Sequence, residues 1–203
     1  MSTVAGPQVF HRAVGLVAVL VDAGHSKREE LTQAGHLCVR KAVAELSGST
    51  AGDIVYDQSG APRWLDERVE SDGTSIQISI AHTGCVAVGV ASTTAVGVDL
   101  ERSDRDVSRL VRGLNERESE LIPRYSVLEV LCAKEAAGKA QKTGLAGSIK
   151  RWLVSEDSGQ LRVTDLGGSD RGNHLVTDPR MWKIDIVRTR VSSISYTCAI
   201  AVP

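Results

Sequence analysis

The sequence predicts an α+β fold made of two similar α+β subdomains, residues 1–94 and 95–203. One observation behind this is that each half contains helical spacing of apolar residues among several short strand-like runs. The other is their order, because strand, helix and further strands follow one another in the first half and again after residues 92–95. The duplication rests on this order of elements, since individual residues do not repeat.

The first half begins with a predicted strand over residues 14–21, which are aliphatic and rich in β-branched side chains. Ser26 and Glu29 form a capping-box pattern, and the apolar spacing that follows predicts a helix that ends near Gly48. Gly60 and Pro62 predict a turn. The remaining strands are expected over residues 53–56, 75–81 and 85–92, the last two forming a hairpin.

The second half repeats this order from residue 96. A strand is expected over residues 96–100, and helical spacing predicts two helices over residues 110–121 and 128–142, the second ending before Gly144. Further strands are expected over residues 151–154, 160–164, 182–187 and 193–202.

Composition and charge exclude several classes of protein. Phe, Tyr and Trp make up 3% of the residues, so the aromatic platforms that stack single-stranded nucleic acid are nearly absent. The net charge of -1 gives no global attraction to nucleic acid or to an anionic membrane. No segment contains the roughly 20 apolar residues of a membrane span. The widely spaced cysteines show no zinc-ligand pattern, which indicates reduced core thiols and a cytoplasmic protein.

Two carboxylates stand at the end of the strand predicted over residues 96–100, in the run Val-Gly-Val-Asp-Leu-Glu. Asp99 and Glu101 are two residues apart, so the period of a strand places them side by side on one face. Close carboxylates repel unless a cation lies between them, and Mg²⁺ suits one or two carboxylates completed by water and phosphate oxygens. The alternative is a strand that ends in acidic loop residues, which is commoner for an isolated pair.

The helix predicted over residues 128–142 carries the run Leu-Cys-Ala-Lys-Glu-Ala-Ala-Gly-Lys-Ala. Glu135 and Lys139 lie four residues apart on one face, and Lys134 precedes Glu135. The alternative is an exposed helix with an ion pair worth roughly 0.2–0.5 kcal/mol. Small residues surround the charges, and Gly138 costs about 1 kcal/mol relative to Ala in a helix. This indicates close packing or a functional need.

A third stretch, Ser-Ile-Ala-His-Thr-Gly at residues 79–84, offers an imidazole and a hydroxyl that suit a phosphate, although an exposed turn histidine is commoner. Together the three stretches closely resemble the 4′-phosphopantetheinyl transferase superfamily, whose signature is a G-x-D-x-E motif followed by a K-E-A-x-x-K helix. Gly60-Ala-Pro62 is similar to the family's G-x-P turn. The resemblance covers about residues 26–142, and the half-domain before the G-x-D-x-E strand resembles the single-chain, pseudodimeric type that activates surfactin synthetase.

The resemblance implies an enzyme of the holo-acyl-carrier-protein synthase type, which transfers the phosphopantetheine arm of coenzyme A to a serine of an apo carrier protein. It implies that Asp99, Glu101 and Glu135 hold Mg²⁺, with Glu135 alternatively accepting the serine proton. Lys139 and Lys134 would stabilise charge on the diphosphate. A monomer with a pseudo-twofold between its halves is also implied. The implied coenzyme A contacts are His82, Thr83, Lys27, Arg28, Gly60, Pro62 and Arg63.

The sequence departs from the family pattern in two places. Leu131 or Cys132 stands where the family often has Trp or Phe, and Ala61 stands where its turn is basic, with Arg63 as a substitute. Glu118 matches an acidic residue of the family only loosely. These departures leave the adenine and phosphate contacts open and do not touch the predicted metal ligands.

Two alternatives belong to other functional classes. The first is a non-catalytic protein of the same fold that binds coenzyme A or a carrier protein. The second is an unrelated Mg²⁺-dependent phosphohydrolase, which the absence of a P-loop and of a second acidic cluster disfavours. For a partner surface, Arg109, Arg112 and Arg117 indicate either a site for an acidic carrier protein or a solvated helix face.

Overall fold

The computed structural model describes residues 6–24, 27–66, 75–145, 148–167 and 180–203, and it is mixed α+β, in agreement with the prediction. The first half contains β1 (Gln8–Ala13), β2 (Leu16–Asp22), α1 (Arg28–Ser47), β3 (Asp53–Tyr56), β4 (Pro62–Leu65), β5 (Gln77–Thr83) and β6 (Val86–Ser92). The second half contains β7 (Gly97–Arg102), the 3₁₀ helices η1 (Leu110–Gly113), η2 (Glu116–Leu121) and η3 (Ile149–Arg151), α3 (Val127–Ala140), β8 (Trp152–Asp157), β9 (Gln160–Asp165), β10 (Met181–Val191) and β11 (Ile194–Val202).

The described strands of each half form their own antiparallel sheet. The first sheet has the order β1-β2-β6-β5 and the second the order β7-β11-β10-β9-β8, while β3 and β4 pair as a separate hairpin. The order β2-β6-β5 in the first sheet matches β7-β11-β10 in the second. In each series the first strand leads to a long helix and then to a hairpin, β3–β4 or β8–β9. The two sheets therefore share the arrangement of three strands and differ outside it, because β1 borders only the first sheet and β8–β9 continues only the second.

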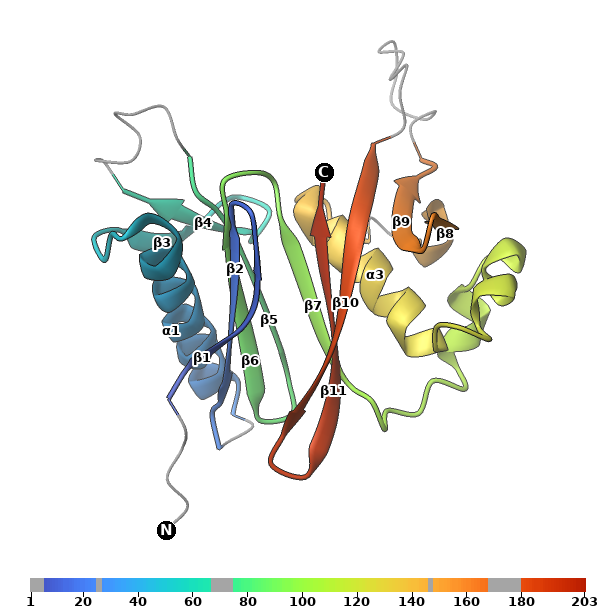
Figure 1. Cartoon of the computed structure of the whole chain (residues 1–203), viewed down its shortest axis with the longest axis horizontal. Coiled ribbons are helices and arrows are strands. Elements are labelled where there is room, and N and C mark those ends of the chain that lie inside the picture. Colours follow the sequence, from blue (N-terminus) through green and yellow to red (C-terminus); the bar gives the residue numbers. More distant parts are fainter. Residues whose placement is uncertain (1–5, 25–26, 67–74, 146–147, 168–179) are drawn as a thin grey trace.

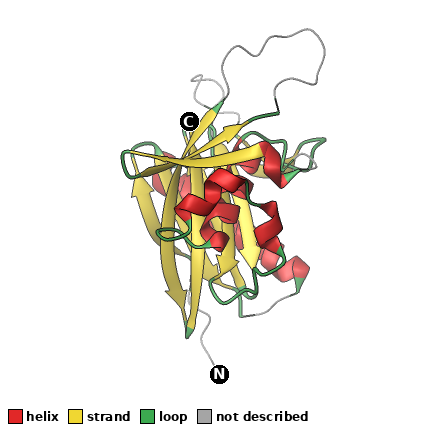
Figure 2. Cartoon of the chain, turned by 90° about the vertical axis from the view of Figure 1, so that its right-hand side faces the viewer, coloured by secondary structure: helices red, strands yellow, loops and turns green. Residues whose placement is uncertain are grey.

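The elements stack in layers. Figure 1 shows α1 and α3 on opposite sides of the molecule, with the two sheets between them. In β2, Val17 and Val19 pack toward α1, whereas Ala18 and Leu20 pack toward the second sheet. Among the described residues, buried apolar side chains form three clusters, one under each helix and one between the sheets. Figure 2, seen from the side of α3, shows the helices lying over the strands.

The two halves share the apolar cluster between the sheets, and polar contacts also join them. The backbone N–H of Val98 in β7 donates to Ser79 Oγ in β5 at 3.1 Å. Nε2 of His11 in β1 lies 3.3 Å from Oδ2 of Asp185 in β10. Because both sheets contribute to this cluster, neither half buries its apolar surface by itself.

The structure differs from the sequence prediction in three places. Residues 110–121 form two 3₁₀ helices rather than one α-helix, because Asn115 is extended and its capping box with Glu118 starts a new helix. Strands β1 and β4 were not predicted, and Pro62, which was expected to end a turn, begins β4. A proline is tolerated at the first position of an edge strand. The predicted helix cap Ser26 lies outside the described residues.

All four cysteines are free thiols, as predicted, and three of them are buried. The burial of Cys38 raises the pKa of its thiol to about 12, so it remains protonated at neutral pH. In the part of the chain that the structure describes, no helix combines the length and the apolar character needed to span a membrane.

Helix α3 lies unusually close to strand β7. A Cβ atom on Gly97 would lie 2.0 Å from the carbonyl oxygen of Ala136 and 2.4 Å from the backbone nitrogen of Ala140. Gly138 likewise packs against the backbone that follows the helix, because its Cβ would lie 2.6 Å from Gly144 O. The small residues of α3 therefore permit backbone-to-backbone packing on both sides of the helix, which accounts for the glycine in its interior.

We expect Gly97→Val to destabilise the protein by about 3 kcal/mol or more, because no rotamer removes its Cβ from the α3 backbone. Urea unfolding followed by circular dichroism would measure the change. Gly6→Ala serves as the control, since a Cβ there meets no atom within 4 Å, and it should alter stability by less than about 0.5 kcal/mol. A Gly97→Val variant as stable as the control would mean that the contact is looser than described.

Candidate functional site

Strand β7 carries Asp99 and Glu101 on the face of the second sheet that α3 covers. Val98 and Leu100 alternate with them and pack into the cluster between the sheets. Asp99 is buried, with 5% of its surface exposed, and the Glu101 side chain is 18% exposed. The strand therefore directs two adjacent carboxylates toward the helix in a partly dry environment.

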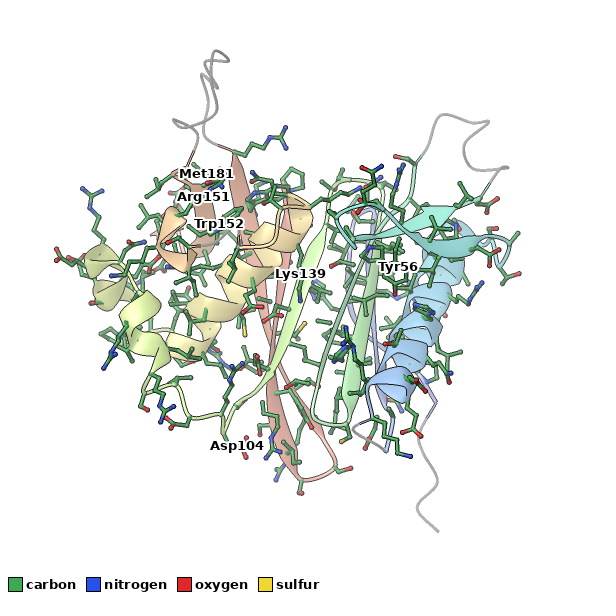
Figure 3. All side chains as sticks on the ribbon, turned by 180° about the vertical axis from the view of Figure 1, so that it is seen from behind. Tyr56, Asp104, Lys139, Arg151, Trp152 and Met181 are labelled. Atoms are coloured by element: carbon green, nitrogen blue, oxygen red, sulfur yellow. The ribbon has the colours of Figure 1, made fainter. Side chains whose placement is uncertain are left out.

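Helix α3 supplies the charges that face these carboxylates. It begins at a capping box in which Ser126 and Glu129 bond to each other's backbone N–H. Lys139 donates from Nζ to Asp99 Oδ1 at 2.8 Å, which joins the helix to the strand. Glu135 lies one helical turn before Lys139 and therefore shares its face. Figure 3 labels Lys139 where α3 passes beside β7.

The three carboxylates act on one another electrostatically. Burial raises the pKa of Glu135, and repulsion from Asp99 and Glu101 raises it further, while Lys139 and Arg105 oppose the rise. Burial also raises the pKa of Glu101, where the Arg105 guanidinium opposes the rise and Asp99 adds to it. Asp99, Glu101, Glu135, Lys139 and Arg105 therefore form one charge cluster, which we call the carboxylate cluster.

Two side chains hold the carboxylate of Glu101. Thr83 Oγ1, at the end of β5, donates to Oε2 at 3.3 Å. Arg105, in the loop that follows β7, donates from Nη1 to Oε1. A pocket of about 380 Å³ lies at this place, lined by Thr83, Glu101, Arg102, Asp104 and Arg105. Asp104, labelled in Figure 3, marks the loop that borders it.

Of the coenzyme A contacts predicted in the first half, Thr83 reaches the carboxylate cluster, whereas the basic residues do not. His82 is exposed and, as the neighbour of Thr83 in a strand, points to the opposite face of β5, on which α1 packs. Lys27 and Arg28 are exposed at the start of α1. Among the described residues, no hydrogen bond or ion pair joins His82, Lys27 or Arg28 to the carboxylates.

The predicted Gly-Ala-Pro turn connects β3 to β4. Asp57 accepts two backbone N–H groups within this turn, and Gly60 has a φ of 80°, a conformation that favours glycine. A cavity of about 40 Å³ has Pro62, Arg63 and Lys142 among its lining residues. The hairpin of the first half therefore meets the segment that follows α3.

Lys134 lies apart from the carboxylate cluster. Its side chain is fully buried, and its Nζ is 2.7 Å from Oε2 of Glu118, which is also fully buried. It further donates to the carbonyl oxygens of Gly113 and Ile149, and Glu118 accepts the N–H of Val154 at 2.7 Å. The prediction that Lys134 acts on a diphosphate does not fit this placement, because its ammonium group is enclosed by protein. Lys134 instead ties α3 to η2 and β8.

Two residues of these sites were missed by the sequence analysis. Arg105 follows Glu101 by four residues in a loop, where a basic side chain has no periodicity that marks it. Lys142 follows α3, and its φ of 59° is rare for a residue other than glycine. Helical spacing placed Lys142 inside the helix predicted over residues 128–142, whereas α3 ends at Ala140.

The donor chemistry of the carboxylate cluster fits Mg²⁺, because carboxylate oxygens are the ligands that this hard cation prefers. Among the residues that the structure describes, however, no group of three His, Cys, Asp or Glu side chains converges as a metal site. Two protein cations pair with the carboxylates instead, since Lys139 bonds to Asp99 and Arg105 bonds to Glu101. A metal ion bound here would compete with one or both of them.

No protein-family model matches this sequence, and no curated protein is significantly similar to it.

We expect Lys134→Met to lower the free energy of unfolding by about 3–5 kcal/mol, because it leaves the Glu118 carboxylate buried without its cation. The double variant Glu118→Gln, Lys134→Met should lose less than the single variant, since no unpaired charge remains. Urea unfolding measures both, with the exposed Lys183→Met as the control. A single variant as stable as the control would contradict the structural role of Lys134.

We also expect Glu135→Gln to stabilise the metal-free protein at pH 8 but not at pH 4. A carboxyl whose pKa is raised by folding favours the folded state when protonated, and that contribution is lost as the pH rises through the raised pKa. The variant cannot ionise, so its melting temperature at pH 8 should rise by about 2–4 °C, the change that 1 kcal/mol produces at this size. Differential scanning fluorimetry with the exposed Glu120→Gln as control would test this, and an unchanged or lower value at pH 8 would count against it.

Proposed function

We propose that this chain is a 4′-phosphopantetheinyl transferase, which moves the phosphopantetheine arm of coenzyme A to a serine of an apo acyl, polyketide or peptidyl carrier protein. The observation that supports this is the meeting of two sequence motifs in one cluster. Asp99 of the Gly-x-Asp-x-Glu motif bonds to Lys139 of the Lys-Glu-Ala helix, 40 residues later in the chain. Residues with no local relation thus converge in the combination that phosphoryl transfer requires.

In the proposed reaction, the serine Oγ forms a bond to the β-phosphorus of coenzyme A while the bond to the 3′,5′-ADP oxygen breaks. Asp99, Glu101 and Glu135 would hold Mg²⁺, which when bound stabilises the charge on the phosphoryl oxygens. Lys139, one-third exposed beside Asp99, would bind an oxygen of the diphosphate. Glu135 either completes the metal ligands or accepts the serine proton, and its raised pKa suits a base.

The coenzyme A contacts proposed in the first half have partial support. Thr83 already contacts Glu101, and the cavity beside Pro62 and Arg63 lies against Lys142 of the second half. A ligand that extends from the carboxylate cluster to the β3–β4 hairpin would contact both halves. His82, Thr83, Lys27, Arg28, Gly60, Pro62 and Arg63 remain the proposed coenzyme A residues.

The finer architecture is part of the same proposal. The arrangement of three strands that the two sheets share supports two subdomains, residues 1–94 and 95–203, related by a pseudo-twofold in a monomer, as in the pseudodimeric transferases. The four free thiols suit the reducing cytoplasm. Arg109, Arg112 and Arg117 are exposed on and beside the 3₁₀ helices, where they could meet an acidic carrier protein.

Intact-mass spectrometry of apo carrier proteins incubated with this protein, coenzyme A and Mg²⁺ tests the proposal. A gain of roughly 340 Da that is lost on adding EDTA is expected, since this is the mass of the transferred arm and the transfer requires metal. No gain with acyl, polyketide and peptidyl carriers, despite measurable binding of coenzyme A, would support a non-catalytic binding protein instead.

We expect Asp99→Asn to reduce the transfer rate by at least about 10²–10³-fold, the typical loss when one group that stabilises transition-state charge is removed. The variant should stay folded, because the amide can still accept a hydrogen bond from Lys139. Asp157→Asn, on the exposed β8–β9 turn, is the control and should keep the full rate. Equal rates for the two variants would remove Asp99 from the proposed metal ligands.

A further inference from the structure

Arg105 holds an oxygen that the proposed metal ion would need. Its guanidinium pairs with Oε1 of Glu101, while Thr83 occupies Oε2 and Lys139 occupies Oδ1 of Asp99. Both oxygens of Glu101 are therefore already bonded to protein. A cation that approaches Oε1 of this carboxylate meets the positive charge of the Arg105 guanidinium, which repels it and competes for the same oxygen.

Arg105 can leave Glu101 while its backbone stays in place. Its backbone N–H bonds to Arg102 O in a turn, and its side chain is 45% exposed, whereas the Glu101 side chain is only 18% exposed. An ion pair with a partner this exposed contributes little, so it breaks readily. Arg105 also lines the 380 Å³ pocket, so its guanidinium can turn from Glu101 toward a ligand in that pocket.

The charge of the carboxylate cluster favours an exchange of partners. Its three carboxylates and two cations leave one net negative charge when all are ionised. A divalent cation added to this set makes it positive, and an anion beside it restores the balance. An arginine released from Glu101 can supply a forked pair of donors that matches two phosphate oxygens.

We propose that Arg105 pairs with Glu101 when no cation is bound and turns to a phosphate group in the adjoining pocket when a divalent cation takes its place on Glu101. Arg105 is thus a further binding residue for the diphosphate of the substrate. This inference rests on the proposed function for its ligands. It is specific to this side chain, since Arg102, which lines the same pocket, pairs with Asp104, and Asp104 is not among the proposed metal ligands.

Binding of Mn²⁺ alone, measured by electron paramagnetic resonance without coenzyme A, tests the first half of the exchange. Arg105→Gln should bind Mn²⁺ about 3- to 5-fold more tightly than the wild type, the factor that corresponds to losing a competing exposed ion pair. Arg124→Gln, which removes an exposed arginine paired with Glu156 outside the pocket, is the control and should leave the Mn²⁺ affinity unchanged. An equal or weaker affinity of Arg105→Gln for Mn²⁺ would overturn the proposal.

Binding of coenzyme A in the presence of Mg²⁺, measured by calorimetry, tests the second half. Arg105→Gln should weaken the binding of coenzyme A by about 10-fold or more, the loss expected for a hydrogen bond between charged groups. The affinity of Arg105→Lys should lie between those of the wild type and Arg105→Gln, because lysine keeps the charge but lacks the forked pair of donors. The exposed Arg124→Gln, which lies in the second half away from the pocket, is the control. An unchanged affinity in Arg105→Gln would also overturn the proposal.

These outcomes separate the inference from the proposed function. Tighter Mn²⁺ and weaker coenzyme A binding in Arg105→Gln, with no carrier protein modified, would leave the role of Arg105 intact and remove the transferase. If the wild type modifies a carrier protein and Arg105→Gln has unchanged affinities for Mn²⁺ and coenzyme A, the transferase is supported and the role of Arg105 is removed. A wild type that binds no Mn²⁺ at millimolar concentration would remove both.

Discussion

The close approach of helix α3 to strand β7 is the contact on which the candidate site depends. At Gly97 a Cβ atom would lie 2.0 Å from the backbone of α3, so the helix reaches this position only because the strand has no side chain there. The same approach puts Lys139 2.8 Å from Asp99 and brings Glu135 into the field of both strand carboxylates. A larger residue at position 97 would move the helix outward, and its charged face would move with it.

This packing creates an electrostatic cost that the protein offsets with its own cations. Three carboxylates lie close together in a partly buried place, and burial and mutual repulsion raise the pKa values of Glu101 and Glu135. Lys139 and Arg105 lower the cost by pairing with the two carboxylates of β7. If a metal binds here as proposed, an anionic ligand that binds with it keeps the total charge of the cluster nearly unchanged.

The two sheets share the arrangement of three strands, but the two halves contribute different chemical groups to the candidate site. Both long helices approach their sheets at a glycine, α1 at Gly89 and α3 at Gly97. Yet β2, which takes the place of β7 in the first sheet, is buried and apolar from Leu16 to Val21, while β7 carries two carboxylates. The first half contributes a hydroxyl, Thr83, and the hairpin cavity instead. The second half therefore supplies the charged side chains, and the first half supplies the hydroxyl and most of the lining of the hairpin cavity. The apolar cluster between the sheets joins the two halves.

Local sequence patterns predict the α+β class, the two long helices and most strands, because each follows from the spacing of apolar residues or from a short apolar run. The same local geometry put Asp99 beside Glu101 on one strand face. Tertiary structure alone decided which charged groups meet. Lys134 and Glu118 are 16 residues apart, and both side chains are completely buried in one ion pair. Arg105 bonds to Glu101 from an exposed loop. A charged side chain looks the same in sequence whether it is buried in an ion pair or free to bind a ligand, because its partner is set by packing between distant segments.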